Sequence, residues 1–159
     1  MEMNFSMSEL DNLLNPNLVK LNIDPPKNFN SLLCLIADCL ASEGMLVDRS
    51  KYIADVLVRE AEGSTYMGRG IGIPHAKTSG VKQAAICMLR FKIPMVYESN
   101  GDSGPVDKIF AISVPENAGR QHLEILASLA RLLVDDDVLY QLSDAKTSEE
   151  YLSIINKKL

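Results

Sequence analysis

Three residues of this sequence could act together on one anionic group, and the first of them is His75. It follows the glycine-spaced apolar stretch GRGIGIP and is one of only two histidines in the 159 residues. A neutral imidazole is nucleophilic at one ring nitrogen while the other nitrogen donates a hydrogen bond. Because Pro74 has a fixed φ and holds Ile73 extended, we expect His75 to project in a fixed direction from the end of a strand. A histidine that only caps that strand is the alternative interpretation.

Arg59 and His122 could support an anionic group at His75. Arg59 lies at the end of a predicted helix, and the segment EGSTYMGRG can bring this helix end back beside the strand. Its guanidinium could bind phosphate oxygens in a bidentate manner. His122 falls in the first turn of another predicted helix, where free N–H groups and the helix dipole favour an anion. Each residue alone fits a solvated surface group, but with His75 the two outline a phosphohistidine site.

Other kinds of site match these residues poorly. The spacing Gly68-x-Gly70-x-Gly72 leads into Ile-Pro rather than into a helix, which excludes a dinucleotide-binding fingerprint. GSTYMGRG has the glycine spacing of a P-loop but lacks its lysine and its Ser/Thr. A metal needs three or four ligands, and no cluster with ligand spacing accompanies the two histidines. Cys87 lies within a predicted strand and no G-x-S-x-G occurs, which disfavours a hydrolase.

Apolar residues at helical spacing predict the helices that carry these side chains. One helix is expected at 29–43 and a second at 50–62, which carries Arg59 near its C-terminal end. A third helix is expected at 120–134, with an apolar stripe of Leu123, Leu126, Ala130 and Leu133. Two short helices, VLYQLSDA and SEEYLSIINKK, follow it.

Three apolar stretches, GIGIP, QAAICMLRF and VDKIFAISVP, predict strands. The last two are apolar almost throughout, which is typical of interior strands covered on both faces. Between them, KIPMVYESNGDSGP is expected to form a loop or hairpin region, with turn residues at Asn100-Gly101 and at Ser103-Gly104-Pro105. Helices and strands interleave, so we expect one α/β domain over residues 1–159, with a central mixed β-sheet flanked by helices on both faces.

Composition limits the partners and the location. The net charge of −5 should repel a phosphate backbone, so no nucleic-acid partner is expected. No apolar run is long enough to span a bilayer, and the N-terminus lacks the pattern of a signal peptide, so we expect a cytoplasmic protein. The three cysteines are interpreted as buried apolar residues rather than as a disulfide framework or zinc ligands.

Four segments of the chain resemble one protein family: REAEGSTYMGRGIGIPHAKTSGVK, GPVDKIFAISVPE, HLEILASLARLLVDDD and SEEYLSII. On them, nearly the whole chain resembles the enzyme IIA domain of the fructose/mannitol family of the bacterial phosphoenolpyruvate-dependent sugar phosphotransferase system. The spacing from Arg-Glu to Ile-Pro-His, followed by the His-Leu helix, carries this likeness. Many members read I-A-I-P-H-G, whereas Gly72 and Ala76 stand here, and Arg69 replaces a small or polar residue. The Pro-His-x-Lys-x-x-x-Val and GPVDKIF runs look most like fructose-type members.

The resemblance implies a phosphoryl carrier. His75 would accept a phosphoryl group, in this family usually on Nε2, from the phosphocarrier HPr. It would pass the group to a cysteine of a IIB domain, which hands it to sugar entering through a membrane IIC domain. Arg59 and His122 match the family's supporting arginine and second histidine, and would neutralise the charge of the transferring group. No metal, nucleotide or other cofactor is implied.

Two other functions are weighed against sugar uptake. A regulatory module of the same fold, such as the nitrogen-related IIA proteins, would control partners through its phosphorylation state rather than feed a sugar. A IIA-like domain of a transcription regulator is disfavoured, because the chain contains no basic DNA-reading element. The sequence alone does not separate uptake from regulation.

Overall fold

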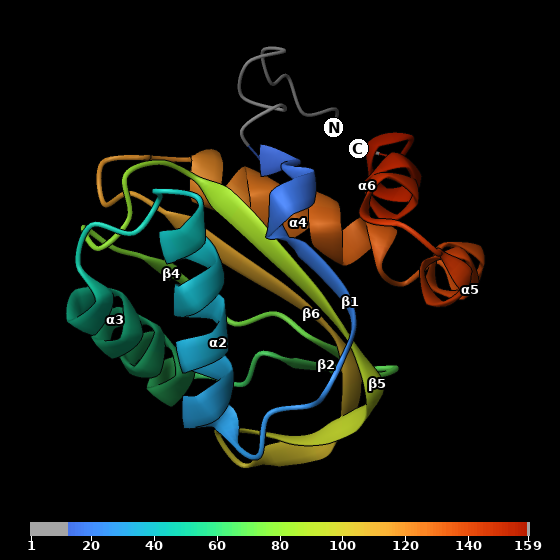
Figure 1. Ribbon diagram of the computed structural model, residues 1–159. Helices are drawn as coiled ribbons and strands as arrows, with labels where there is room; N and C mark the ends of the chain where they lie inside the picture. The colour runs from blue at the N-terminus through green and yellow to red at the C-terminus, as the bar shows by residue number, and fades with distance from the viewer. Residues whose placement is uncertain (1–12, 159) are drawn as a thin grey trace.

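The computed structural model describes residues 13–158, except for the side chains of Gln121 and His122, as a mixed sheet with helices on both faces (Figure 1). The strand order is β1-β5-β6-β3-β2, and β4 pairs with β6 on the same edge as β3. The predicted α/β class with a central mixed sheet is confirmed. In chain order, the elements are η1 (Pro16–Leu18), β1 (Val19–Ile23), α2 (Phe29–Ser42), α3 (Arg49–Glu62), β2 (Tyr66–Gly68), β3 (Ile71–Gly72), β4 (His75–Lys77), β5 (Ala85–Ser99), β6 (Asp102–Val114), α4 (Gln121–Leu132), α5 (Asp136–Asp144) and α6 (Ser148–Asn156).

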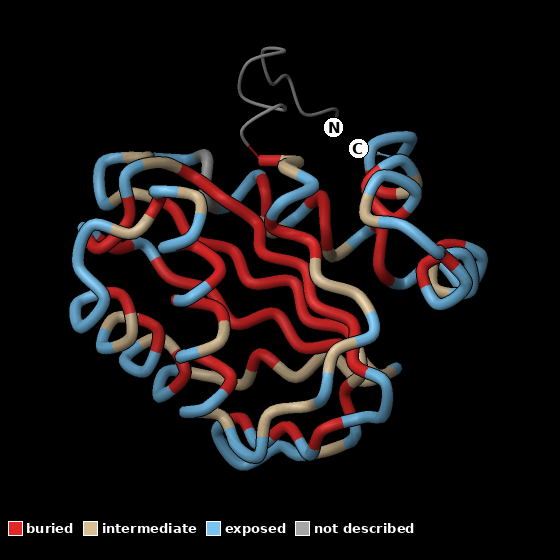
Figure 2. Tube along the Cα trace, viewed as in Figure 1, coloured by how far each residue is buried: buried red, intermediate tan, exposed pale blue. Residues whose placement is uncertain are grey.

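Both faces of the sheet are buried because its long strands carry apolar side chains at successive positions. In β5, Cys87 and Leu89 belong to the core beneath α2 and α3, while Ile86 and Met88 belong to the core beneath α4, α5 and α6. Figure 2 shows the central strands buried and the outer surfaces of the helices exposed. The prediction of interior strands covered on both faces is therefore confirmed.

The segment predicted as a loop or hairpin region between the two long strands forms a hairpin that continues both of them. The chain reverses at only two residues, Asn100 and Gly101, whose φ angles are 46° and 94°. A two-residue turn with positive φ follows the right-handed twist of the strands, as the Asn-Gly pair predicts. The second predicted turn, at 103–105, is wrong because these residues pair with 96–98 of β5. Gly104 serves the close approach of Tyr66, whose ring would clash with a Cβ there.

The predicted strand GIGIP is only partly formed, because Gly70, Ile73 and Pro74 lie outside the strands. β3 contains only Ile71 and Gly72, and His75 begins β4 rather than following the end of a strand. The break falls at Pro74, which has no N–H to donate to a ladder. Two further short strands, β1 and β2, have no counterpart in the prediction, because their half-buried residues show no clear alternation.

Glycine has two distinct uses before His75. Gly68 and Gly70 have positive φ, as does Arg69 between them, and these three residues reverse the chain from β2 into β3. At Gly72 the limit is space, since a Cβ would lie 2.7 Å from Cε2 of the buried Tyr97 ring. The glycines before His75 therefore serve a reversal of the chain and close packing against the Tyr97 ring.

Two predictions of burial are wrong. Leu123 is 64% exposed, because it lies about 200° around α4 from Ile125, which belongs to the core. Cys34 is exposed, whereas Cys39 and Cys87 are buried as predicted. The exposure of Cys34 follows from the rotation of α2, whose buried side consists of Leu32, Leu33, Ile36, Ala37, Cys39 and Leu40.

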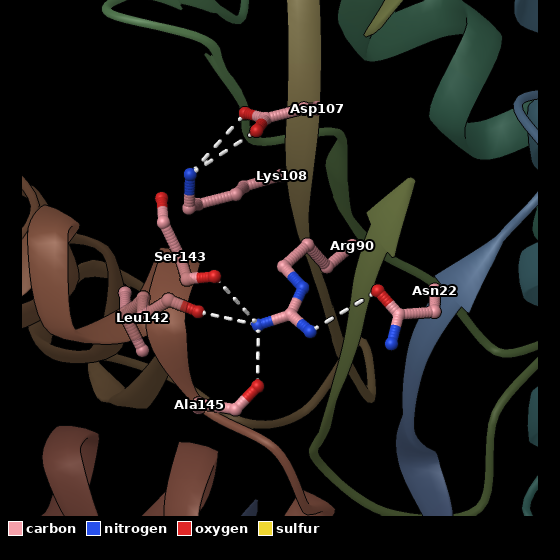
Figure 3. A network of polar contacts seen from close by, with 7 residues as sticks. All are labelled: Asn22, Arg90, Asp107, Lys108, Leu142, Ser143 and Ala145. Atoms are coloured by element: carbon pink, nitrogen blue, oxygen red, sulfur yellow. Dashed lines mark hydrogen bonds and ion pairs between the residues drawn. The ribbon is translucent and has the colours of Figure 1, made fainter. Parts of the chain in front are cut away.

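Arg90 of β5 connects the sheet to the end of α5 (Figure 3). Its buried Nη1 donates to the carbonyl oxygens of Leu142, Ser143 and Ala145 at 2.8, 3.2 and 2.8 Å, and Nη2 donates to Oδ1 of Asn22 at 3.3 Å. The last carbonyls of a helix have no partner within it and carry partial negative charge. The guanidinium therefore satisfies these carbonyls and holds α5 against the sheet.

Candidate functional site

His75 is held between two hydrogen-bonding groups, and only 6% of the residue is exposed. Its Nδ1 lies 2.9 Å from the carbonyl oxygen of Ile73, and its Nε2 lies 3.1 Å from Nε of Arg59. A carbonyl oxygen only accepts and a guanidinium only donates, so Nδ1 carries the ring proton and the lone pair is on Nε2. This tautomer makes Nε2 the nucleophilic atom of the ring.

The backbone before His75 is fixed on both sides of Pro74. The N–H of Ile73 donates to the carbonyl oxygen of Thr65 at 3.0 Å, and the carbonyl oxygen of Pro74 accepts from the N–H of Ile112 at 3.1 Å. Between these bonds the proline ring limits rotation about φ. The Ile73 carbonyl that receives the His75 proton therefore has a defined direction.

Arg59 reaches His75 from the last turn of α3. This helix begins after Asp48, whose side chain accepts from the N–H of Lys51, and ends at the cap residue Gly63. Nη1 of Arg59 donates to the carbonyl oxygen of Gly63 at 2.9 Å, while Nε donates to His75. Nη2 donates to no group within the described part of the chain. The structure thus brings Arg59 and His75 together, and the guanidinium has donor capacity left for an anion.

The surroundings keep His75 neutral. Burial lowers the pKa of His75 below its ordinary value, and the charge of Arg59 lowers it further, whereas the hydrogen bond to Ile73 acts in the opposite direction. At pH 7 the imidazole is therefore uncharged. A neutral ring leaves its lone pair for a new bond, and the adjacent arginine provides the positive charge for an anionic group on Nε2.

His122 is the second residue of α4, so its predicted place in the first turn of a helix is confirmed. The further prediction that its imidazole lies beside His75 concerns a side chain outside the described ones. Its supporting role therefore stays a prediction.

A groove opens beside the site. It has a volume of about 410 Å³ and runs between α3 and β4. Arg59 forms part of its wall, and Ala76 and Lys77 directly follow His75, so a partner seated there would lie next to the imidazole. The lining mixes both charges with one exposed apolar side chain and consists of Asp55, Val58, Arg59, Glu62, Ala76 and Lys77.

A buried polar cluster behind His75 was not assigned any role from the sequence. We call it the Glu60 cluster; it comprises Glu60, Thr65, Tyr97 and Ser99. Oγ1 of Thr65 and Oγ of Ser99 each lie 2.5 Å from one carboxylate oxygen of Glu60. The hydroxyl of Tyr97 lies 2.5 Å from Oγ1 of Thr65. In the sequence, only the Arg-Glu pair of the family pattern pointed to this cluster, because Tyr97 and Ser99 come from a hairpin far along the chain.

The described residues form neither a metal site nor a membrane-spanning helix. Among the described side chains, which do not include that of His122, no three of His, Cys, Asp or Glu lie close enough together to hold a metal ion. The helices within residues 13–158 are too short or too polar to cross a membrane.

The mixed sheet has helices on both faces, and a neutral histidine at the site is hydrogen-bonded to an arginine. This combination places the protein in the class of IIA-type phosphotransferase folds. The chain belongs to the family described as phosphoenolpyruvate-dependent sugar phosphotransferase system, EIIA 2, whose model matches residues 12–158. The resemblance inferred from the sequence segments is therefore confirmed.

Individual relatives carry different functional names. The chain is 36% identical over 149 residues to the PTS system fructose-specific EIIABC component of Bacillus subtilis (strain 168), a match that covers 94% of this chain and 23% of that protein. The nitrogen regulatory protein IIA-Ntr from Neisseria meningitidis has a similar solved structure, with a TM-score of 0.75 and 27% identity over 92% of this chain and 97% of that one.

A second solved structure supports the fold alone. It is the complex of enzyme IIAMTL and phosphorylated enzyme IIBMTL from Escherichia coli, with a TM-score of 0.70 and 17% identity over 89% of this chain and 95% of that one.

Proposed function

We propose that His75 carries a phosphoryl group on Nε2 between a donor protein and an acceptor protein. The observation that supports this most directly is the pair of hydrogen bonds that leave the proton on Nδ1 and the lone pair on Nε2. In the first transfer, this lone pair forms a bond to phosphorus as the bond between phosphorus and the donor breaks. In the second, an acceptor thiolate forms the new bond to phosphorus, and Nε2 regains its lone pair.

Arg59 has to change partners during this transfer. In the unphosphorylated protein its Nε donates to the Nε2 lone pair, which is the atom that phosphorus must reach. Because Nη1 stays anchored to Gly63, a small rotation releases Nε2 while the charge remains nearby. Nε and Nη2 can then donate to phosphoryl oxygens, where charge-assisted bonds are strong. We assign His122, at the start of α4, the second supporting role.

The phosphoryl donor in this proposal is phospho-HPr, and the acceptor is a cysteine of a IIB domain. The IIB domain would pass the group to a sugar entering through a membrane IIC domain, so this chain would contact the membrane component only indirectly. The name of the Bacillus subtilis relative, with IIA, IIB and IIC in one component, favours this order and a fructose-type sugar.

Phosphorylation in a reconstituted system tests the site. The protein is incubated with phosphoenolpyruvate, enzyme I and HPr, and acid-labile phosphate on the chain is measured. We expect the parent protein to be labelled and His75→Ala to remain unlabelled. If His75→Ala is labelled as well as the parent, the assignment of the nucleophile is wrong.

A regulatory function is the second candidate, because a nitrogen regulatory IIA-Ntr protein matches over nearly the whole length of both chains. Such a protein would act on partners according to its phosphorylation state. Adding candidate IIB domains to the phosphorylated protein separates the two functions. Rapid loss of label to a IIB cysteine supports uptake, and discharge to none of them supports regulation.

A further inference from the structure

We propose that the Glu60 cluster is a positioning device for His75, which holds the ring proton on Nδ1 by fixing the Ile73 carbonyl. The consequence for phosphoryl transfer rests on the function proposed above, whereas the consequence for the tautomer does not. The cluster acts on the imidazole through the backbone of Thr65 and Ile73.

Thr65 is the centre of the cluster because it is bound through both its side chain and its backbone. Its hydroxyl donates to Glu60, so the 2.5 Å contact with Tyr97 has the Tyr97 hydroxyl as donor. Its N–H donates to Oγ of Ser99 at 2.7 Å, and that hydroxyl in turn donates to the second carboxylate oxygen of Glu60. Each of these groups therefore has a defined donor or acceptor role.

The fixed backbone of Thr65 carries this order to the imidazole. Its carbonyl oxygen accepts from the N–H of Ile73 at 3.0 Å, and the carbonyl oxygen of Ile73 accepts the Nδ1 proton at 2.9 Å. A shift of the 63–66 segment would move Ile73 and weaken the bond to Nδ1. The ring could then also carry its proton on Nε2, the form without a lone pair at the attacking atom.

The same carboxylate fixes the arginine side of the site. Glu60 directly follows Arg59 in the last turn of α3, and its carboxylate accepts hydrogen bonds from Thr65 and from Ser99 of β5. Buried polar groups of this kind are costly when left unpaired, so the closed set of bonds resists displacement. One cluster thus sets the separation between the arginine and the histidine.

Thr65→Val removes the central hydroxyl with little change in shape, and Thr65→Ser retains it. Tyr151→Phe is the matched control, because it also removes a buried hydroxyl, but from α6 on the opposite face of the sheet. The full chain is labelled with ¹⁵N, and long-range ¹H–¹⁵N correlations of the imidazole report which nitrogen carries the proton. His75→Gln identifies the His75 signals. Single-turnover phosphorylation by phospho-HPr is measured on the same samples.

We expect the parent, Thr65→Ser and Tyr151→Phe to show the Nδ1–H tautomer, and Thr65→Val to show a mixture of both. Phosphorylation of Thr65→Val should be about 10-fold slower, a typical loss when a group that orients a reactive side chain is removed. A folded Thr65→Val with the parent tautomer and the parent rate overturns the proposal.

Two further outcomes stay informative. If Thr65→Val does not fold, Tyr97→Phe replaces it, because that change removes only the outer hydroxyl; an unchanged tautomer and rate there contradict the proposal. If no variant, including the parent, accepts a phosphoryl group, the proposed function is wrong, while the tautomer of Thr65→Val still decides whether the cluster positions His75.

Discussion

Replacing Arg59 by alanine is the sharpest test of the site, because it removes two effects that act in opposite directions. In the unphosphorylated protein, Nε of Arg59 donates a hydrogen bond to the Nε2 lone pair of His75 and so lowers the reactivity of this nucleophile. During transfer, the same guanidinium would stabilise the phosphoryl oxygens. The net result decides whether the residue supports the reaction.

The magnitudes favour a slower reaction. A guanidinium about 4 Å from one phosphoryl charge contributes roughly 4 kcal/mol at an effective dielectric constant of about 20. Removing one positioned donor from an anionic transition state costs about 3–4 kcal/mol in enzymes. Losing the ground-state hydrogen bond from the charged guanidinium to Nε2 returns about 1.5 kcal/mol. The difference of about 1.5–2.5 kcal/mol corresponds to a rate roughly 10- to 70-fold lower.

The assay is rapid-quench phosphorylation by phospho-HPr under single-turnover conditions. Arg49→Ala is the matched control, because Arg49 begins the same helix but forms an exposed ion pair with Asp38, which contributes little stability. We expect Arg49→Ala to react like the parent. Arg59→Ala should also have a higher His75 pKa, since the charge of Arg59 lowers it, and the acid limb of its rate profile should move to higher pH. A rate equal to or above that of the parent would refute this account of Arg59.

Three further predictions concern stability and are measured by urea unfolding. Below about pH 6.5 the parent should lose stability as pH falls, because burial depresses the His75 pKa and the unfolded chain then binds the proton first; His75→Gln should lack this contribution. Arg90→Met should lower the free energy of unfolding by about 2–4 kcal/mol, because it leaves carbonyl groups at the end of α5 without a donor. Gly72→Ala should cost about 1–3 kcal/mol, because the new Cβ would press on the Tyr97 ring.

Each of these predictions has a contradicting result. Parallel pH profiles for the parent and His75→Gln would show that His75 titrates alike in the folded and unfolded states. An Arg90→Met protein as stable as the parent would mean that desolvation of the buried charge offsets its hydrogen bonds. A Gly72→Ala protein as stable as the parent would show that the Tyr97 ring moves aside at no cost in stability.

Much of the fold follows from local chemistry in the sequence. Apolar periodicity locates α2 and α3 to within one or two residues, and the Asn100-Gly101 pair marks the hairpin turn. The strand lengths do not follow, since Pro94 and Pro105 suggest a loop, whereas both lie within long strands. A strand accommodates proline only at a position whose N–H would make no hydrogen bond to the neighbouring strand. The register of the two strands determines which positions these are.

The sequence by itself determined which residues could form the site. A lone histidine after Ile-Pro, an arginine one helix earlier and a family pattern around both identify His75 and Arg59 as candidates. Only the tertiary structure decided how they are used. The Ile73 carbonyl fixes the proton on Nδ1, Arg59 contacts Nε2, and a hairpin more than twenty residues downstream completes the Glu60 cluster. Periodicity cannot reveal these relations, because hydrogen-bond direction and burial depend on how distant segments pack together.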